Sequence, residues 1–146
     1  MKLYITVNKP IPNSYTGIDL ATQKIDFNNL DPICERAECT EMILDSVLSH
    51  IIINKLPDLL KQLITRLRKG GKIIIIDTEI NEVLKKYLNG LLNIYDVNCL
   101  LFGNEKMNKR GKYSHSDIQQ ILTNNNLEII SIALNSTIFT LTAQRN

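Results

Sequence analysis

The sequence contains three side chains that can exchange protons and that lie where a substrate could reach them. Asp45 and Ser46 directly follow the short apolar run 40–44, and His115 lies in a polar segment at the start of a predicted helix. Open α/β sheets bind ligands at the carboxyl ends of their strands, and a histidine can take a proton from a substrate hydroxyl or amine. We take Asp45, Ser46 and His115 as candidate catalytic residues. Helix capping by Asp45 or Ser46 and solvation of His115 are the alternatives.

The three cysteines and two histidines are not spaced as metal ligands. Cys34, Cys39 and Cys99 form neither a CxxC motif nor a cysteine–histidine knuckle with His50 or His115. Three cysteines also cannot all pair with one another. We therefore expect no bound metal and no disulfide framework, and we expect His50 to be a packing or surface residue.

One cluster of basic residues lies just before His115 in the sequence. It consists of Lys106, Lys109, Arg110 and Lys112, with Tyr113 adjacent. Such a cluster could contact nucleic acid, and it is also typical of a solvated loop. The net charge of the whole chain is only +2, so charge alone indicates no partner.

Length and composition predict one globular domain over residues 1–146. Hydrophobic residues make up 44% of the chain and charged residues 22%, which argues against disordered and fibrous classes. The longest aliphatic run, 73–76, is far shorter than the ~20 residues of a membrane helix. Polar residues follow the N-terminal methionine at once, unlike a secretory signal. We expect a cytoplasmic protein without a membrane span.

In the first half, apolar runs predict short strands separated by polar segments. Segments 3–7, 15–20 and 40–44 are predicted strands, and 25–36 is too rich in turn-forming residues for a confident element. The connection 8–14 is shorter than a usual parallel crossover, so the first two strands form either an abbreviated crossover or a hairpin. Leu48, Ile51 and Ile52 continue at helical spacing.

The middle of the chain predicts a helix followed by a central strand. Apolar residues recur every three or four positions over 56–69, and Pro57 suits the first turn. Gly70 and Gly71 can cap this helix at its C-terminus. The run 73–76 is apolar on both faces, as a central strand of a helix-covered parallel sheet requires.

The second half predicts two helices and a terminal hairpin. The first helix, 79–88, presents one apolar face and ends near Gly90. Segment 91–102 is apolar and ambiguous, and 103–112 is a polar loop. The second helix begins at Ser114, with Asp117 three residues later as a capping box. Segments 127–134 and 137–143 predict strands joined by a turn at 135–136. The fold class is α/β, with a mostly parallel Rossmann-like sheet, an abbreviated N-terminal half and a C-terminal antiparallel hairpin.

Several strings in this order resemble class I S-adenosylmethionine-dependent methyltransferases. Residues 67–75, LRKGGKIII, are similar to the "L-k-P-G-G-k-l-x-I" turn that enters the fifth strand of that fold, with Lys69 in place of proline. Residues 41–51 resemble the "e-I-x-x-x-h-v-L-E-H-i" segment of small methyltransferases, with Ser49 in place of glutamate. The string 101–103 leading to His115 is similar to the substrate-side loop, and the final hairpin matches the reversed last strand. The resemblance covers nearly the whole chain.

The resemblance implies S-adenosylmethionine as cofactor and assigns residues to it. Asp19 would bind the ribose, Asp26 would contact adenine, and Thr6, Val7 and Asn8 would line the methionine part. Asp45, Ser46 and His115 would face the methyl acceptor. The sequence departs from the family pattern at Thr6 and Asn8, which replace two glycines. In the family, those glycines let the backbone pass close to the cofactor.

These observations lead to three functional hypotheses. The first is a methyltransferase that moves a methyl group in line from the sulfonium to an unknown acceptor, which needs alignment and deprotonation but no metal. The second is a degenerate, non-catalytic subunit that serves as a structural or substrate-presenting partner of another protein, which the loss of both glycines favours. The third is a nucleic-acid-binding module that uses the basic loop. A protein partner or a homo-oligomer is compatible with the first two.

Overall fold

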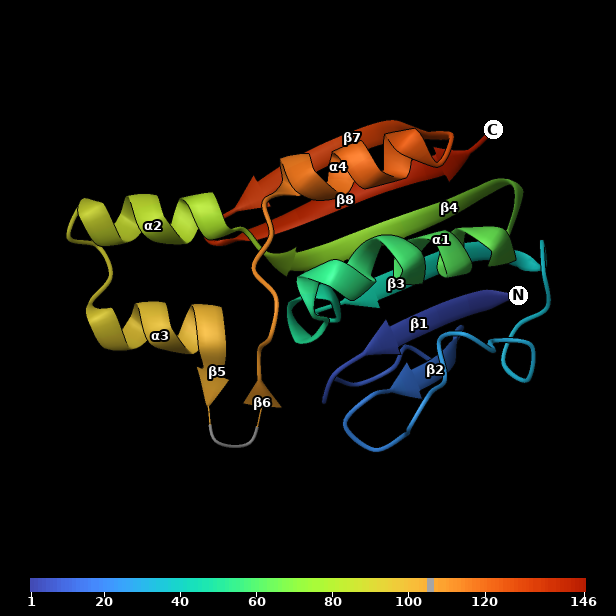
Figure 1. The fold of residues 1–146 in the computed structure, drawn as a ribbon, viewed down its shortest axis with the longest axis horizontal. Coiled ribbons are helices and arrows are strands. Elements are labelled where there is room, and N and C mark those ends of the chain that lie inside the picture. The colour runs from blue at the N-terminus through green and yellow to red at the C-terminus, as the bar shows by residue number, and fades with distance from the viewer. Residues whose placement is uncertain (105–106) are drawn as a thin grey trace.

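A computed structural model describes residues 1–104 and 107–146, and its centre is a six-stranded sheet (Figure 1). The strand order is β2-β1-β3-β4-β8-β7. The strands are β1 (Lys2–Thr6), β2 (Thr16–Asp19), β3 (Cys39–Asp45), β4 (Leu67–Thr78), β7 (Leu127–Asn135) and β8 (Ile138–Arg145). The first four are parallel, whereas β8 runs antiparallel to both β4 and β7. The predicted α/β class with its terminal antiparallel hairpin is confirmed.

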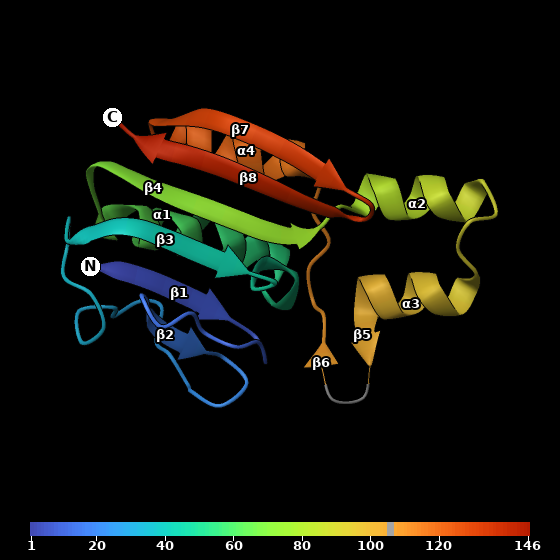
Figure 2. The same cartoon turned by 180° about the vertical axis from the view of Figure 1, so that it is seen from behind.

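Two helices cover one face of this sheet. Figure 1 shows α1 (Leu56–Arg66) and α4 (His115–Asn124) in front of the strands, and Figure 2 shows the strands from behind with no helix over them. Burial follows this asymmetry along β4. Ile73 and Ile75 face the helices and are wholly buried, whereas Ile74 and Ile76 point to the other face and are partly exposed. The hydrophobic core therefore lies on one side of the sheet.

The remaining elements lie beyond the carboxyl ends of the parallel strands. The helices α2 (Ile80–Leu88) and α3 (Ile94–Phe102) extend past the end of β4 (Figure 1). Two short strands, β5 (Gly103–Asn104) and β6 (Met107–Asn108), pair antiparallel after α3. Two 3₁₀ turns, η1 (Leu48–His50) and η2 (Ile53–Lys55), lead from β3 to α1. No helix in the described part of the chain is long and apolar enough to cross a membrane.

The first half is abbreviated, as the sequence predicts. Strands β1 and β2 are parallel, so the crossover interpretation is confirmed and the hairpin is wrong. Neither connection, 7–15 or 20–38, contains a helix. The second connection is held by the buried side chain of Arg66, which contacts Asp31 and donates to the carbonyl of Cys34 at 3.0 Å. This arginine and the buried Leu30 replace the packing that a crossover helix would supply.

The predicted helix 56–69 ends earlier, and the glycine pair has another role. Helix α1 stops at Arg66, because Leu67 already pairs with Cys39 as the first residue of β4. Gly70 has a φ of +76°, and a Cβ on Gly71 would lie 2.8 Å from the carbonyl oxygen of Cys39. The glycines therefore allow β4 to bend closely past β3, and the predicted C-cap is wrong.

Other local predictions differ in detail. The helical spacing of Leu48, Ile51 and Ile52 yields only the turn η1 and not a longer helix. The ambiguous segment 91–102 contains α3, whose capping box joins Asn93 and Asp96. The capping box at the start of α4 is confirmed. The hairpin turn lies at 136–137 and not at 135–136, because Asn135 still pairs with Ile138.

Candidate functional site

The ends of β1, β2 and β3 bring three of the predicted site residues side by side. In the sheet register, Thr6 on β1 lies opposite Asp19 on β2 and opposite Asp45 on β3. Parallel strands that end at one edge present their last side chains together. The structure therefore gathers Thr6, Asp19 and Asp45 at one edge, as expected from the order of the strands.

Asp45 is enclosed by partners from its own chain. Its Oδ2 atom accepts a hydrogen bond from the Tyr4 hydroxyl at 2.7 Å, and its Oδ1 atom accepts from Lys9 Nζ at 2.5 Å. The Ser46 hydroxyl donates to Oδ1 at 3.1 Å and also accepts from Lys9 Nζ at 2.8 Å. We call Tyr4, Lys9, Asp45 and Ser46 the Asp45 cluster. It contains the predicted pair Asp45 and Ser46 and adds two residues that the sequence analysis missed.

Electrostatics in the Asp45 cluster favour the charged carboxylate. Burial alone would raise the pKa of Asp45, but the hydrogen bonds from Lys9 and Tyr4 outweigh it and hold the pKa below its ordinary value. Burial, and then the hydrogen bond to Asp45, raise the pKa of Tyr4 to about 12. A carboxylate with a lowered pKa and three donors is a weak proton acceptor. The geometry therefore suits an ion pair at this position better than a general base.

Asp19 is used to shape the loop after β1. Its Oδ1 atom accepts from the backbone N–H of Asn8 at 2.8 Å and from that of Ala21 at 2.9 Å. Asn8 has a φ of 56°, a left-handed conformation that asparagine tolerates better than most residues. Thr6 is wholly buried, and within the described residues its hydroxyl oxygen has no hydrogen-bond partner. Val7 is also buried, whereas Asn8 is exposed, so two of the three residues predicted to line the methionine part pack inward.

A cavity lies next to Asp26, on the segment between β2 and β3. Its volume is about 430 Å³, within the range of small-molecule sites. The lining residues come from 25–28, from the turns before α1 and from α1 itself: Ile25, Asp26, Phe27, Asn28, Ile51, Lys55, Asp58, Leu59 and Gln62. Asp26 is therefore placed at a hollow, whereas Thr6, Asp19 and Asp45 do not line it.

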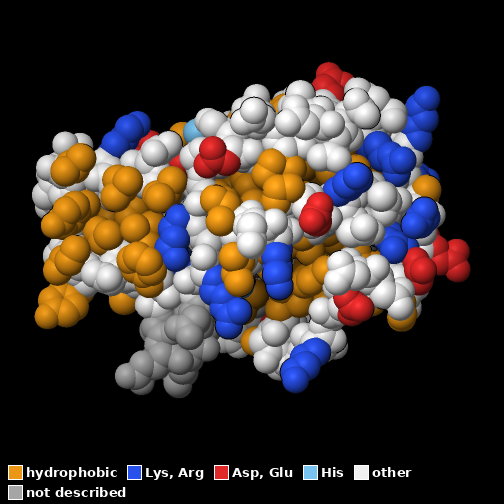
Figure 3. Space-filling view, viewed as in Figure 1, with side chains coloured by type: hydrophobic (Ala, Val, Ile, Leu, Met, Phe, Trp, Pro, Cys, Tyr) orange, Lys and Arg blue, Asp and Glu red, His pale blue; other side chains and the backbone are white. Residues whose placement is uncertain are grey.

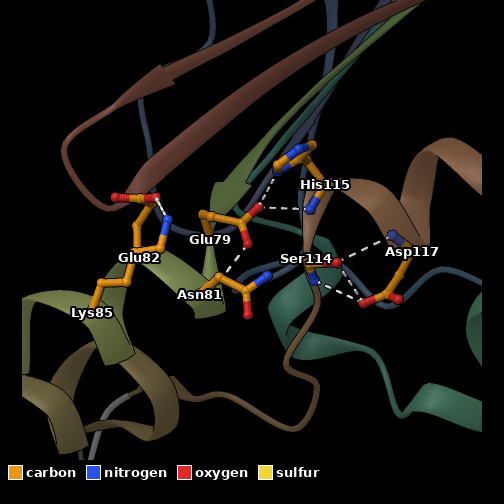
Figure 4. Close-up of polar contacts among 7 residues, drawn as sticks. All are labelled: Glu79, Asn81, Glu82, Lys85, Ser114, His115 and Asp117. Carbon is orange, nitrogen blue, oxygen red and sulfur yellow. Dashed lines mark hydrogen bonds and ion pairs between the residues drawn. The ribbon is translucent and has the colours of Figure 1, made fainter. Parts of the chain in front are cut away.

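His115 is positioned by a buried glutamate that the sequence analysis missed (Figure 4). Glu79 follows β4 directly and is 1% exposed. Its Oε2 atom lies 2.7 Å from Nδ1 of His115 and accepts from the His115 backbone N–H at 2.6 Å, while Oε1 accepts from the Asn81 backbone N–H at 3.2 Å. A carboxylate at Nδ1 orients a histidine for proton transfer, and it also joins the starts of α2 and α4. The position of Glu79 directly after β4 is the signal by which the sequence could have indicated it.

The two groups of candidate catalytic residues lie at the ends of different elements: Asp45 and Ser46 at the end of β3, and His115 at the start of α4. The N–H of Glu79 donates to the carbonyl of Thr137 at 2.7 Å, which places the His115–Glu79 pair beside the start of β8. Asp45 lies on β3, which borders β4 on the side away from β8, and it pairs there with Ile76. Among the described residues, no hydrogen bond or ion pair connects His115 with Asp45 or Ser46. Their joint action on one acceptor stays a prediction.

The basic loop is largely engaged within the chain. Lys109 Nζ donates to the carbonyl of Leu100 at 3.0 Å and to the Thr78 hydroxyl at 3.3 Å, and burial lowers its pKa while the charge of Asp77 opposes that shift. Lys112 Nζ lies 4.3 Å above the ring of Phe102. Of the remaining cluster, Arg110 is exposed and Lys106 lies outside the described residues. Lys109 is therefore a structural cation and not a solvated one.

Groups of acidic, cysteine or histidine side chains able to hold a metal are absent from the part of the chain that the structure describes.

Comparisons with known proteins place the fold. No family model and no curated protein matches the sequence. Among solved structures, human N-acetylserotonin methyltransferase in complex with S-adenosylmethionine superposes with a TM-score of 0.62 at 16% identity, over 99% of this chain and 41% of that one. A 1,6-didemethyltoxoflavin-N1-methyltransferase from Burkholderia thailandensis gives 0.60 at 10% identity, over 99% and 71%. Magnesium protoporphyrin IX methyltransferase from Synechocystis PCC 6803, with bound S-adenosylhomocysteine, gives 0.52 at 19% identity, over 90% and 51%.

The match extends over most of this chain but over only part of the larger proteins. The chain spans about half the length of these solved methyltransferases, between 41% and 71%. Identities below 20% with nearly complete coverage of this chain show a shared architecture alone, because one fold supports many activities. The parallel strands, the reversed last hairpin and the order of the elements agree with these matches. The chain therefore has the fold of the S-adenosylmethionine-dependent methyltransferases.

Proposed function

We propose that this chain is a methyltransferase-fold subunit that does not transfer a methyl group itself and acts as a structural or substrate-presenting partner of another protein. The Asp45 cluster is the observation that carries this proposal. It joins the ends of β1 and β3 through the Lys9–Asp45 ion pair, where the family resemblance would have the cofactor and the acceptor meet. The side chains at that position bind one another.

The residues at the end of β1 do not fit the methionine part of S-adenosylmethionine. Thr6 and Asn8 carry side chains where the family pattern has glycines, and Thr6 is wholly buried. The cofactor's sulfonium is a cation, and Lys9 already places a cation against Asp45. Two like charges near one carboxylate repel each other, so Lys9 opposes a second cation there. The end of β1 therefore opposes binding of the sulfonium.

A second candidate is a cofactor-dependent methyltransferase acting on an unknown acceptor. Two observations favour it: Asp19 ends β2 as the resemblance requires, and Asp26 lines the cavity of about 430 Å³. In this case His115, oriented by Glu79, would deprotonate the acceptor. This candidate requires Lys9 to leave Asp45, which its partly exposed side chain permits sterically.

Calorimetric titration with S-adenosylmethionine and S-adenosylhomocysteine separates the two candidates. The subunit proposal predicts no saturable heat from the wild-type chain. Micromolar binding that is lost in Asp19→Ala would overturn it and establish a working cofactor site.

A Lys9→Met variant tests the physical reason. It removes the ammonium and keeps the length of the side chain. Binding that is gained only in this variant would show that Lys9 closes the site, in support of the proposal. Circular dichroism of each variant must match that of the wild type, so that loss of fold does not pass for loss of binding.

A further inference from the structure

The helices α2 and α3 carry an apolar surface that the described residues leave exposed (Figure 3). Figure 3 shows hydrophobic side chains gathered over these two helices. The exposed members are Leu84, Tyr87, Leu88, Leu91, Ile94, Tyr95 and Phe102, and we call them the α2–α3 face. Leu88 is 81% exposed, Leu91 71% and Tyr95 80%. Large apolar side chains are rarely left so open in one place without a role.

Among the described residues, most of the α2–α3 face has no covering partner, although Lys112 Nζ lies 4.3 Å from the ring centroid of Phe102 at one edge of it. The sequence predicts one apolar stripe over Ile80, Val83, Leu84, Tyr87 and Leu88, but α2 buries only Val83 of these. In α3, likewise, Val97 is the buried residue. A stripe at helical spacing normally faces a core. The pattern is therefore that of a buried helix face, whereas most of its side chains point to solvent.

The size of the α2–α3 face suits an interface between proteins. With roughly 170 Å² for each side chain at full exposure, its seven members present about 700 Å². The largest apolar patch on a typical monomer covers about 300–600 Å², and a stable interface buries about 800 Å² on each partner. With a polar rim added, the α2–α3 face reaches the area that a stable dimer needs.

Charge indicates which partner fits. Residues 80–102 contain two acids, Glu82 and Asp96, and two lysines, Lys85 and Lys86, so their formal charge is zero. Apart from Lys112, which lies over Phe102 at one edge, the face offers no net charge to an acidic or basic partner, and a membrane surface favours helices rich in lysine and arginine. A second copy brings the same balanced charges and the same apolar stripe. Two helical hairpins related by a twofold axis can bury both stripes as a four-helix bundle.

We propose that the chain forms a symmetric homodimer through the α2–α3 face. Dimerisation at this face goes beyond the role proposed above and does not depend on whether the cofactor binds. In the dimer, Leu88 and Tyr95 of each copy lie in the buried centre. Glu82 and Lys85 lie at the rim, where they already pair at 3.2 Å within one chain.

Sedimentation or light scattering tests the dimer directly. The wild type should show twice the mass of one chain at high micromolar concentration, and Leu88→Glu or Tyr95→Glu should show the mass of one chain. Ile53→Glu is the matched control, because Ile53 is an equally apolar side chain, is 67% exposed and lies outside the face. It should stay dimeric. A monomeric wild type at all concentrations, or dissociation in the control as well, would overturn the proposal.

Cys99 supplies a second, independent readout. It is exposed on α3, one turn after Tyr95, so it lies on the same stripe, whereas Cys34 and Cys39 are buried. A thiol reagent should therefore label Cys99 about tenfold more slowly in the concentrated wild type than in Leu88→Glu, because mass action protects the dimer interface. Equal labelling rates in a sample that sediments as a dimer would place the interface elsewhere and refute this face.

Discussion

The replacement of Asp45 by asparagine is the most direct test of the Asp45 cluster. The amide keeps the size of the carboxylate but removes its charge and one acceptor. Lys9 then loses its ion partner, and Tyr4 donates to a neutral oxygen instead of a charged one. The amide NH₂ then faces either Lys9, whose ammonium has no acceptor, or Tyr4, whose hydroxyl would have to stop donating to this side chain in order to accept.

The expected loss follows from the exposure of each partner. The Lys9 side chain is 42% exposed, so solvent screens this ion pair, and its part of the loss is about 1 kcal/mol or less. The hydrogen bond from Tyr4 is buried, and a hydrogen bond to a charged group contributes about 1 kcal/mol more than one to a neutral group. Together Asp45→Asn should lower the free energy of unfolding by about 2 kcal/mol, a fall in Tm of roughly 4–8 °C for a domain of this size.

The pH dependence gives the sharper result. The folded-state pKa of Asp45 is lowered, so its charged form stabilises the fold above the unfolded pKa of about 3.9. This contribution disappears as the pH falls through the folded pKa. Urea unfolding of the wild type and of Asp45→Asn should therefore differ at neutral pH and converge in acid.

Glu128→Gln provides the control, because Glu128 is an exposed carboxylate on β7. Its free energy of unfolding should stay close to that of the wild type. A neutral-pH loss for Asp45→Asn no larger than that for Glu128→Gln would refute the reasoning. A difference between Asp45→Asn and wild type that persists undiminished in acid would refute it as well.

Three further variants test other parts of the structure by urea unfolding. Gly111→Ala would place a Cβ 2.3 Å from the carbonyl oxygen of Ile51 and should cost about 1–3 kcal/mol; a neutral effect would mean that this loop packs differently. Ser114→Ala removes the cap that accepts from the Asp117 N–H, at a cost of about 1 kcal/mol, and an unchanged stability would argue against the capping box. Burial, and then the charge of Asp77, raise the pKa of Tyr113 to about 12. The neutral phenol therefore contributes its full stabilisation below the unfolded pKa of about 10, and this contribution is lost as the pH rises toward 12. Tyr113→Phe should therefore fall furthest below the wild type near neutral pH and approach it near pH 12, and an alkaline titration should lose one late-ionising phenol.

Much of the fold could be predicted because its signals are local. The three-and-four spacing over 56–66 and the isoleucines 73–76 specify α1 and the centre of β4 through side-chain direction alone. The capping box of Ser114 and Asp117 spans three residues and was recognisable for the same reason. The end of α1 could not be predicted in this way, because Leu67 leaves the helix to pair with Cys39 on β3, a strand distant in sequence.

The candidate site was predicted in part. Strand order and strand ends suffice to place Asp19 and Asp45 at one edge of the sheet. Their hydrogen-bond partners were beyond reach, and these partners change the interpretation: Lys9 makes Asp45 an ion-pair residue, and Glu79 orients His115.

The sequence by itself determined the elements, their order and the family resemblance, because periodicity, capping and turn chemistry act within a few residues. Only the tertiary structure decided which charges meet. Lys9 and Asp45 are 36 positions apart, as are Glu79 and His115, and each pair forms where strands and helix starts converge at the carboxyl edge of the sheet. Likewise, the stripe on α2 reads the same in sequence whether it faces a core or solvent. Its exposure depends on where the end of β4 directs the helix, which is set by the packing of the whole sheet.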